Sequence, residues 1–469
     1  MKTYIKFIPV LLLLLISACK VSKDLPAPVS ATPAQFRDVS STDTSSIAAF
    51  PWKSFFKDPA IGKLIDSALV KNYDLQIALK NMESAALLYS QSKAGNIPSI
   101  FLNVTANTSR PSDNSLNGLS TSTFLNTSHI EDYNANLSLS WEADIWGKIR
   151  SRKQAALSSF LQTAEARKAV QTSLVAEIAR GYYRLLMLDA QLTIAKRNLA
   201  LNDSTLRMIH LQFDAGQVTA LAIQQAEAQQ MVAVQLMPQL EQEIGIQENA
   251  LSVLTGHVPS AIARESKLSD ILAEDQYAVG IPSVMVSRRP DVRSAELALQ
   301  VANANVGIAT ASLYPSLTIT ASGGLNSFRA SNWFNIPASL FGAVAGGLTQ
   351  PLLDRKRITT QVAVSKVERE KAVLQFRGTV LTAVAEVSDE LIKTQKLKQQ
   401  YDVAGQRVKT LQTAVKNSSM LFSNGMANYL EVITAQRNSL QGELDLAALR
   451  TAQLEAKIDL YRALGGGWK

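Results

Sequence analysis

Cysteine and histidine are scarce in this sequence, and long apolar runs are almost absent. The 469 residues include one cysteine and three histidines, and no internal run of about 20 apolar residues occurs. A single cysteine excludes an intrachain disulfide and a multi-cysteine metal site. The histidines, His129, His210 and His257, lie far apart, so we expect no metal site. Without a long apolar run, we expect no internal transmembrane helix.

Motifs of enzymes and of nucleic-acid-binding proteins are also missing. The sequence contains no P-loop, no dinucleotide-binding glycine fingerprint and no nucleophile elbow. The formal charge of +8 is spread over helical stretches in which Lys and Arg are interleaved with Asp and Glu, which is typical of solvated helix faces. No basic patch with interleaved aromatic residues occurs. We therefore expect no catalysis, no cofactor and no nucleic-acid binding.

The one long apolar run is at the N-terminus, after Lys2 and Lys6. A basic start, a short apolar core and small residues before a cut site predict a signal peptide over 1–18. The residues that end at Cys19 resemble a bacterial lipobox, in which the cysteine receives a diacylglycerol. Cys19 is thus the predicted lipidation site, and 19–48 an acylated tether. The alternative is an ordinary signal peptide with an incidental cysteine. The residue that follows the cysteine is Lys20 and not Asp, and this pattern resembles that of lipoproteins sorted to the outer membrane.

The rest of the chain is an internal duplication. Each half predicts a helix, a strand, a loop, a second strand, a long helix, a tight turn and another long helix. Pro98 corresponds to Pro315, 217 positions away, and Gly216 corresponds to Gly425, 209 positions away. The difference falls in the strand–loop–strand region, where length changes are tolerated. We therefore divide the chain after its tether into a first repeat, 49–280, and a second repeat, 281–469.

The helices are unusually long for a globular domain. In the first repeat we expect helices over 60–93, 148–213 and 219–254, with Pro238 permitting a kink in the last. A helix of about 65 residues is about 100 Å long, which suits a tube, a stalk or a coiled coil.

Each repeat also contains two strands of about 9–11 residues with one apolar and one polar face. This is the length and pattern of a tilted strand that crosses a bilayer. Strands in lipid must close into a barrel, and four are too few, so the barrel would be shared between chains. A trimer would supply twelve strands, but the order of elements does not choose three copies over two or four. The alternative is a soluble sandwich whose core takes the apolar faces.

The two strand faces are predicted residue by residue. The polar face, expected to line a water-filled lumen, comprises Asn103, Thr105, Asn107, Asn136, Ser138, Thr318 and Thr320. The apolar face, expected to contact lipid, comprises Ile100, Leu102, Val104, Leu137, Leu139, Leu317 and Ile319.

Several motifs resemble one protein family. They are Asp58-Pro59, 72–78 (NYDLQIA), 141–148 (WEADIWGK), 288–296 (RRPDVRSAE), 313–317 (LYPSL) and 350–354 (QPLLD). Together with the duplication and the lipobox, they resemble the outer-membrane factors of bacterial efflux pumps, the TolC/OprM-like proteins, in their lipoprotein (NodT-type) branch.

The resemblance implies a fold class of mixed α and β. A membrane β-barrel shared between the subunits of a homotrimer, with four strands per chain, would continue into a long periplasmic α-helical barrel. It implies a lipid-anchored protein of the outer membrane that contacts its lipid. A periplasmic adaptor (membrane fusion protein) and an inner-membrane pump, commonly of the resistance-nodulation-division type, would be its partners. Drugs or other small molecules would pass through it passively.

The resemblance also suggests where the functional residues lie. The strand–helix joint would be formed by Trp141, Glu142, Asp144, Gly147 and Pro351. The helical turns, expected to dock the adaptor, carry Phe213, Gly216, Gln217, Phe422, Gly425 and Met426. The periplasmic gate of the family has two acidic positions, which fall here on Glu431 and Thr434. Since Thr434 is not acidic, this chain departs from the family at the second acidic position. The alternative interpretation of Glu431 is an exposed helix residue with no role in a gate.

Two other functions stay open. A channel for type I protein secretion shares the expected architecture. A lipid-anchored periplasmic coiled-coil adaptor or scaffold would instead show one helical hairpin flanked by small β-domains. The lipobox and the segment 288–293 favour efflux. The exported compounds and the partner pump are not encoded in any motif.

Overall fold

The computed structural model describes residues 46–271, 280 and 282–468. The predicted signal peptide, the lipidation site Cys19 and most of the tether lie outside this range. The described chain divides into two compact units. The strand unit holds 83–161 and 296–374, and the helix unit holds the described residues of 46–82, 162–295 and 375–468.

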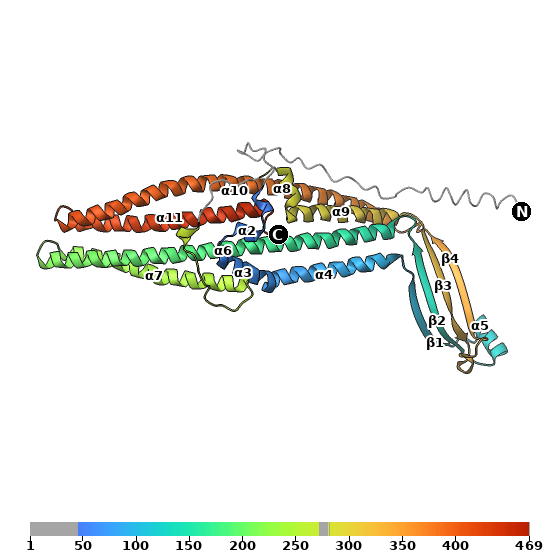
Figure 1. Cartoon of the computed structure of the whole chain (residues 1–469). Helices are drawn as coiled ribbons and strands as arrows, with labels where there is room; N and C mark the ends of the chain where they lie inside the picture. Colours follow the sequence, from blue (N-terminus) through green and yellow to red (C-terminus); the bar gives the residue numbers. More distant parts are fainter. Residues whose placement is uncertain (1–45, 272–279, 281, 469) are drawn as a thin grey trace. The chain divides into compact units, whose positions relative to one another are not determined.

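Four strands form one antiparallel sheet in chain order (Figure 1). They are β1 (Ser99–Ser109), β2 (Ile130–Ala143), β3 (Ser316–Ser327) and β4 (Leu340–Thr349). All four predicted strands are confirmed, although β2 and β3 have 14 and 12 residues, more than expected. The sandwich alternative is not observed, because the strands of the described chain make a single sheet.

The register sorts the strand residues into two faces as predicted. Leu102 pairs with Leu137, and Asn103 pairs with Asn136; directly paired residues share a face. Across the three pairings, every predicted apolar residue falls on one face and every predicted polar residue on the other. The apolar face is open to solvent within the chain, with Leu102 70% and Val344 81% exposed.

The connection between β1 and β2 is more ordered than the long loop expected there. It contains a short helix, α5 (Leu116–Ser120), and a π-helical turn, η3 (Thr121–Leu125). The Ser115 hydroxyl accepts the N–H of Gly118 at 3.1 Å, and the Thr121 hydroxyl donates to the Asn117 carbonyl at 2.7 Å. Such local side-chain bonds stabilise a helical turn in a polar Ser/Thr/Asn segment.

The long helices confirm the duplication. The first hairpin consists of α6 (Lys148–Asp214) and α7 (Ala220–Leu254), and the second of α10 (Arg357–Ser423) and α11 (Tyr429–Ala463). Both hairpins have helices of 67 and 35 residues, and each boundary recurs 209 positions later. Pro238 lies inside α7 without ending it.

Asn72 splits the single helix expected over 60–93, and that prediction is wrong. The chain forms α3 (Pro59–Lys71) and α4 (Tyr73–Lys93) instead. The Asn72 side-chain oxygen accepts the N–H of Leu75 at 3.0 Å, and its amide donates to the carbonyl of Leu254, the last residue of α7, at 3.0 Å. An Asn side chain that caps one helix and bridges to another element favours a break over helix continuation.

Arg289 takes the same place in the second repeat, before α9 (Pro290–Ala311). Its Nη1 donates at 2.9 Å to the carbonyl of Ala463, the last residue of α11. The guanidinium also binds Asp291, with Nε to Oδ1 at 3.0 Å, and Glu386, with Nη2 to Oε2 at 2.8 Å. Both repeats therefore fix the end of a hairpin helix with the side chain that precedes their own α4 or α9.

The core of the helix unit packs α2 (Trp52–Phe55) and α3 against α6 and α11. Burial, with Asp58 nearby, raises the pKa of Tyr182 to about 12. Tyr461 stacks on Phe55 with ring centroids 4.0 Å apart and donates to the Phe50 carbonyl at 2.7 Å. The remaining short helices are η1 (Ile47–Ala49), η2 (Ala94–Asn96), η4 (Leu268–Asp270), α8 (Pro282–Arg288) and η5 (Ala330–Asn332).

None of the helices in the described residues has the length and apolar character needed to cross a membrane.

Candidate functional site

The first strand–helix joint lies between β2 and α6, where Asp144 caps the helix. Its two carboxylate oxygens each accept one backbone N–H, from Ile149 and from Arg150, both at 2.9 Å. Gly147 adopts a φ of 74°, a left-handed conformation that glycine reaches without steric cost. Glu142 forms an ion pair with Lys148 at 2.9 Å. The acidic residues of this joint are thus occupied within the chain.

Two tryptophans anchor the same joint to neighbouring backbone. The indole N–H of Trp141 donates to the Asn96 carbonyl at 2.9 Å, and that of Trp146 donates to the Pro315 carbonyl at 2.7 Å. Trp146 also stacks on Tyr314, with ring centroids 4.7 Å apart. These bonds connect the joint to both repeats, so the predicted joint residues on this side come together.

The second joint, between β4 and α10, repeats the cap but not the glycine. Asp354 accepts the N–H of Ile358 at 2.9 Å. Arg355 and Lys356 have φ values of 56° and 64°, and Lys356 is the counterpart of Gly147. A residue with a Cβ is strained in this conformation. Pro351 lies exposed at the start of this joint.

The two helical turns close in the same way. Gly216 and Gly425 have φ values of 73° and 71°. The N–H of Gln217 donates to the Gln212 carbonyl, and that of Met426 to the Leu421 carbonyl, both at 2.8 Å. This is the hydrogen-bond pattern of a Schellman helix end, which requires a left-handed residue, usually glycine. Both glycines therefore cap the helices that end at the turns.

The turns differ in what they expose. Phe213 is 40% exposed and Met426 is 68% exposed, whereas Phe422 is only 2% exposed. Phe422 lies in an apolar cluster with Ile209, Ala222, Ala226, Val432 and Ile433, which joins the two hairpins. As a site residue, Phe422 therefore supports the turn from inside and does not belong to its surface.

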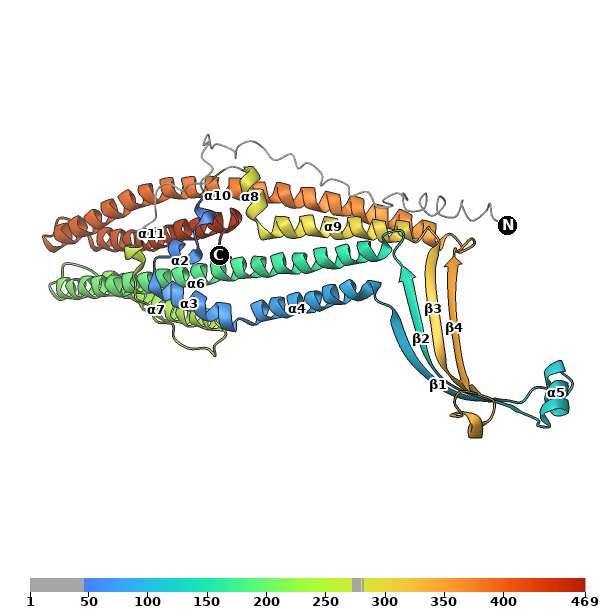
Figure 2. The same cartoon turned by 45° about the vertical axis from the view of Figure 1, so that its right-hand side comes forward.

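Two hydrogen bonds also join the hairpins, and sequence reasoning missed both. The Tyr429 hydroxyl donates to Gln225 Oε1 at 2.7 Å, and Gln436 Nε2 donates to the Thr205 hydroxyl at 2.8 Å. Figure 2 shows the ends of the two hairpins on the same side of the helix unit. Nothing in the local pattern marks these residues, because each partner lies more than 200 positions away.

Glu431 and Thr434 lie one helical turn apart at the start of α11. The Asn428 side chain caps this helix by accepting the N–H groups of Leu430 and Glu431, at 2.7 and 3.3 Å. The Glu431 side chain is exposed and forms no ion pair with the described residues, whereas Thr434 is half-buried. The first-repeat counterpart of Glu431, Ala222, is fully buried, so only the second repeat presents a carboxylate here.

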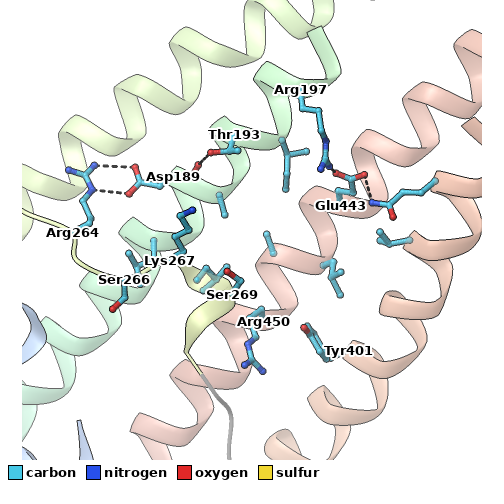
Figure 3. Close-up of a pocket in the computed structure, with 18 of the residues that line it drawn as sticks. Asp189, Thr193, Arg197, Arg264, Ser266, Lys267, Ser269, Tyr401, Glu443 and Arg450 are labelled. Atoms are coloured by element: carbon cyan, nitrogen blue, oxygen red, sulfur yellow. Dashed lines mark hydrogen bonds and ion pairs between the residues drawn. The ribbon is translucent and has the colours of Figure 1, made fainter. Parts of the chain in front are cut away.

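A pocket of about 780 Å³ lies in the helix unit between α6, α10, α11 and the connector after α7 (Figure 3). Arg264 binds Asp189 through Nε and Nη2, at 2.8 and 3.2 Å, and also binds Glu248. Burial alone would lower the pKa of Arg264, but the two carboxylates outweigh it and raise the pKa. Arg197 pairs with Glu443. These charges are paired with one another, and the ion pairs of Arg264 attach the connector to α6 and α7.

Within the described residues, no cluster of three or more His, Cys, Asp or Glu side chains is arranged to hold a metal ion.

Comparison with known proteins identifies the family. The family model "Outer membrane efflux protein" matches residues 64–257 and 281–466. The solvent efflux pump outer membrane protein SrpC of Pseudomonas putida is 30% identical over 472 residues, which covers 99% of this chain and 98% of SrpC. The cation efflux system protein CusC of Escherichia coli is 27% identical over 469 residues and covered to 99% on both sides.

Solved structures agree. A crystal structure of CusC has a TM-score of 0.85 at 26% identity, over 96% of this chain and 100% of that chain. The open state of the MtrE outer membrane channel of Neisseria gonorrhoeae has a TM-score of 0.85 at 25% identity, over 96% of this chain and 99% of that chain. The chain therefore belongs to the outer membrane efflux protein family and is an outer-membrane component of an efflux system.

Proposed function

We propose that three copies of this chain form the outer-membrane duct of a tripartite efflux system. The observation that carries the proposal is the sheet, which has an exposed apolar face, a polar face and two edge strands, β1 and β4. Because neighbouring strands are antiparallel, β1 and β4 run in opposite directions. The β4 edge of one copy can therefore pair antiparallel with the β1 edge of the next, and three sheets close a ring of twelve strands.

In this assembly the two faces of the sheet have different surroundings. Leu102, Leu137 and Ile319 contact lipid, and Asn103, Asn136 and Thr320 line a water-filled lumen. The long helical hairpins of the two repeats, 49–280 and 281–469, extend into the periplasm. Cys19, acylated after removal of 1–18, anchors each copy to the outer membrane through its tether.

The helical turns are the proposed docking surface for a periplasmic adaptor. The adaptor connects the duct to an inner-membrane pump of the resistance-nodulation-division type. The exposed side chains of Phe213, Gln217 and Met426 supply the contacts. Gly216 and Gly425 shape the turns by adopting a left-handed conformation. Phe422 holds the second turn in place from the core. A crosslinker placed at Gln217 or Met426 should capture an adaptor in cells, and its consistent failure to do so would reject this assignment.

Glu431 is the proposed selective position of the duct. Three carboxylates at one constriction attract cations and repel anions, and Thr434 adds an uncharged polar ring one turn further on. In planar bilayers, Glu431→Gln should reduce cation preference while the channel still inserts. Glu241→Gln, which removes an exposed carboxylate in the middle of α7, is the matched control and should leave the preference unchanged. Equal ion selectivity in wild type and Glu431→Gln would reject the gate but not the duct.

The names of the relatives favour efflux over protein secretion, since they refer to solvent, toluene, antibiotic and cation efflux. Two hairpins and an amphipathic sheet are also not the layout expected of an adaptor. The proposed cargo is accordingly small molecules, conducted passively. A deletion strain should become more susceptible to some members of a panel of solvents, antibiotics and metal salts, and the intact gene should restore resistance. Unchanged susceptibility to every member would contradict the proposed cargo.

A further inference from the structure

Six basic residues gather at the two strand–helix joints. Since β2 and β4 run in the same direction, both joints lie at the same end of the sheet. The six, called the joint cations here, are Arg150, Arg152, Lys153, Arg355, Lys356 and Arg357. All six are exposed, and none forms an ion pair with another residue that the structure describes.

The acidic residues near the joint cations are already engaged. Asp144 and Asp354 accept backbone N–H groups at the starts of α6 and α10, and Glu142 binds Lys148. The joint therefore carries a net positive charge that the chain itself does not neutralise.

This placement is locally unfavourable. Arg150 lies in the first turn of α6, and Arg357 is the first residue of α10. The N-terminal end of a helix carries a partial positive charge, so cations there destabilise it. Arg355 and Lys356 also occupy left-handed backbone conformations. These residues have a locally unfavourable charge or backbone conformation and no compensating contact with the described part of the chain. Such residues indicate a contact with another molecule.

Apolar surface adjoins the joint cations. Leu352 and Leu353, directly before Asp354, are 87% and 99% exposed. Leu348, at the end of β4, is 69% exposed and pairs with Leu317 on the apolar face of the sheet. A band of exposed aliphatic side chains that ends in a cluster of cations fits the boundary between acyl chains and phosphate headgroups.

A cavity of about 380 Å³ lies at the first joint, between α4, η2, β1, β2 and the start of α6. Arg152 lines it together with the hydroxyl-bearing Ser99 and Ser140, and Leu88 and Ile149 contribute apolar wall. Glu142 also lines the cavity, and its carboxylate is paired with Lys148. This volume is at the lower end of the range for small-ligand sites. One cation, several hydroxyls and an apolar wall suit the phosphate and glycerol of a phospholipid.

We propose that the joint cations and this cavity bind anionic phospholipids of the leaflet that faces the periplasm. The inference rests on the proposed placement of the sheet in the bilayer. The lipid phosphate contacts the joint cations, and its acyl chains run along the apolar face of the sheet. Such binding would fix the height of the duct in the membrane, at the level where strands give way to helices.

Native mass spectrometry of the full-length protein in detergent tests the proposal. Wild type should retain added phosphatidylglycerol, which is anionic, in preference to phosphatidylcholine, which is zwitterionic. The triple variant Arg150→Gln, Arg152→Gln, Lys153→Gln should bind phosphatidylglycerol roughly tenfold to a hundredfold more weakly, because each cation near a membrane surface contributes independently to binding anionic lipid. The triple variant Arg355→Gln, Lys356→Gln, Arg357→Gln should lose affinity as well.

A matched control removes the same charge elsewhere. The triple variant Lys196→Gln, Lys409→Gln, Lys416→Gln changes three exposed lysines of the helix unit and should bind phosphatidylglycerol like wild type. Equal loss in this control, or no loss in either joint variant, would overturn the proposal. Inorganic phosphate that displaces phosphatidylglycerol at an equal concentration would also overturn it, since the site would then recognise free phosphate and not a lipid.

Conductance of the same preparations in planar bilayers separates this inference from the proposed function. Joint variants that conduct but lack bound phosphatidylglycerol support both. A conducting wild type with no preference for the anionic lipid overturns the lipid site alone. A wild type that never inserts or conducts overturns the duct, and the lipid site with it.

Discussion

The two helical turns hold equivalent places in the duplication, yet they are built for different surroundings. Phe422 is 2% exposed and packs between the hairpins, whereas Phe213 is 40% exposed. Asn428 caps α11 through its side chain, but Thr219 makes no side-chain bond to the start of α7. The second turn is therefore stabilised by a buried aromatic side chain and by a side-chain cap, neither of which the first turn has.

A similar divergence separates Asn72 from Arg289. Each side chain donates a hydrogen bond to the last carbonyl of a hairpin helix, but Asn72 does so with a neutral amide and Arg289 with a charged guanidinium. Both repeats therefore keep the same backbone arrangement at these positions but stabilise it with different side chains. At these two pairs of positions, the second repeat uses a buried aromatic ring and a charged group where the first repeat does not. Its variants at these positions should therefore have the larger effects.

Phe422→Ala should have the largest effect. Removing a fully buried phenylalanine leaves a cavity and costs about 3–5 kcal/mol of unfolding free energy. Phe213→Ala should cost less than half as much, because more of the ring is already in solvent. Hydrogen exchange of the amides near both turns measures the difference locally. Equal protection in the two variants would mean that the turns are equivalent after all.

Arg289→Ala should come next, at about 3 kcal/mol, because it leaves Asp291 and Glu386 without their shared cation. Asn72→Ala should cost about 1–2 kcal/mol, the amount typical of a lost neutral hydrogen-bond partner. Thermal unfolding followed by circular dichroism in detergent compares the two. A cost for Arg289→Ala no greater than that for Asn72→Ala would show that the ion pairs contribute little.

Of these two sites, only the Arg289 site should contribute to stability in a pH-dependent way. Burial alone would raise the pKa of Asp291, but its hydrogen bonds to Arg289 and the guanidinium charge outweigh burial and lower the pKa. An acid with a lowered folded pKa stabilises above its unfolded pKa, about 3.9, and loses that contribution as the pH falls through the folded value. The stability gap between wild type and Asp291→Asn should therefore be constant above about pH 5 and shrink in acid.

The two joints share a left-handed backbone at Gly147 and Lys356 but carry different residues there, and Gly147→Ala tests that difference. A Cβ at a φ of 74° should cost about 1–2 kcal/mol, because it approaches the following carbonyl oxygen. Lys356→Gly, at a φ of 64°, should leave stability unchanged or slightly increased, since relief of strain offsets the added chain entropy. Melting temperatures of the two variants should move apart, and a shift in the same direction would contradict the assigned strain.

Asn428→Ala should have the smallest effect, about 1 kcal/mol, through loss of a helix cap. Thr219→Ala is the matched variant in the first repeat and should be close to neutral, because the Thr219 side chain makes no cap bond. Hydrogen exchange in the first turns of α7 and α11 resolves both. If Thr219→Ala increased exchange at the start of α7 while Asn428→Ala left α11 unchanged, the assignment of Asn428 as the side-chain cap would be wrong.

Much of this protein is determined by its sequence. The strand faces follow from alternation at period two, and the boundaries of α6 and α7 follow from the positions of Gly147 and Gly216. The duplication follows from motifs that recur at offsets of 217 and 209 positions. These features depend on neighbours within a few residues, so they can be read without knowing where distant segments lie.

Only the tertiary structure decided the rest. Whether a phenylalanine near the end of a long helix is surface or core depends on what packs against it. Phe422 packs with Ile209 and Ala222, which belong to the other repeat. The break at Asn72 depends on the carbonyl of Leu254, and the bond from Tyr429 to Gln225 spans 204 positions. The joint cations are two separate short runs in the sequence, and the antiparallel sheet brings them to one end. Burial and pairing depend on which distant segments of the chain meet in the folded structure, and local periodicity does not encode this.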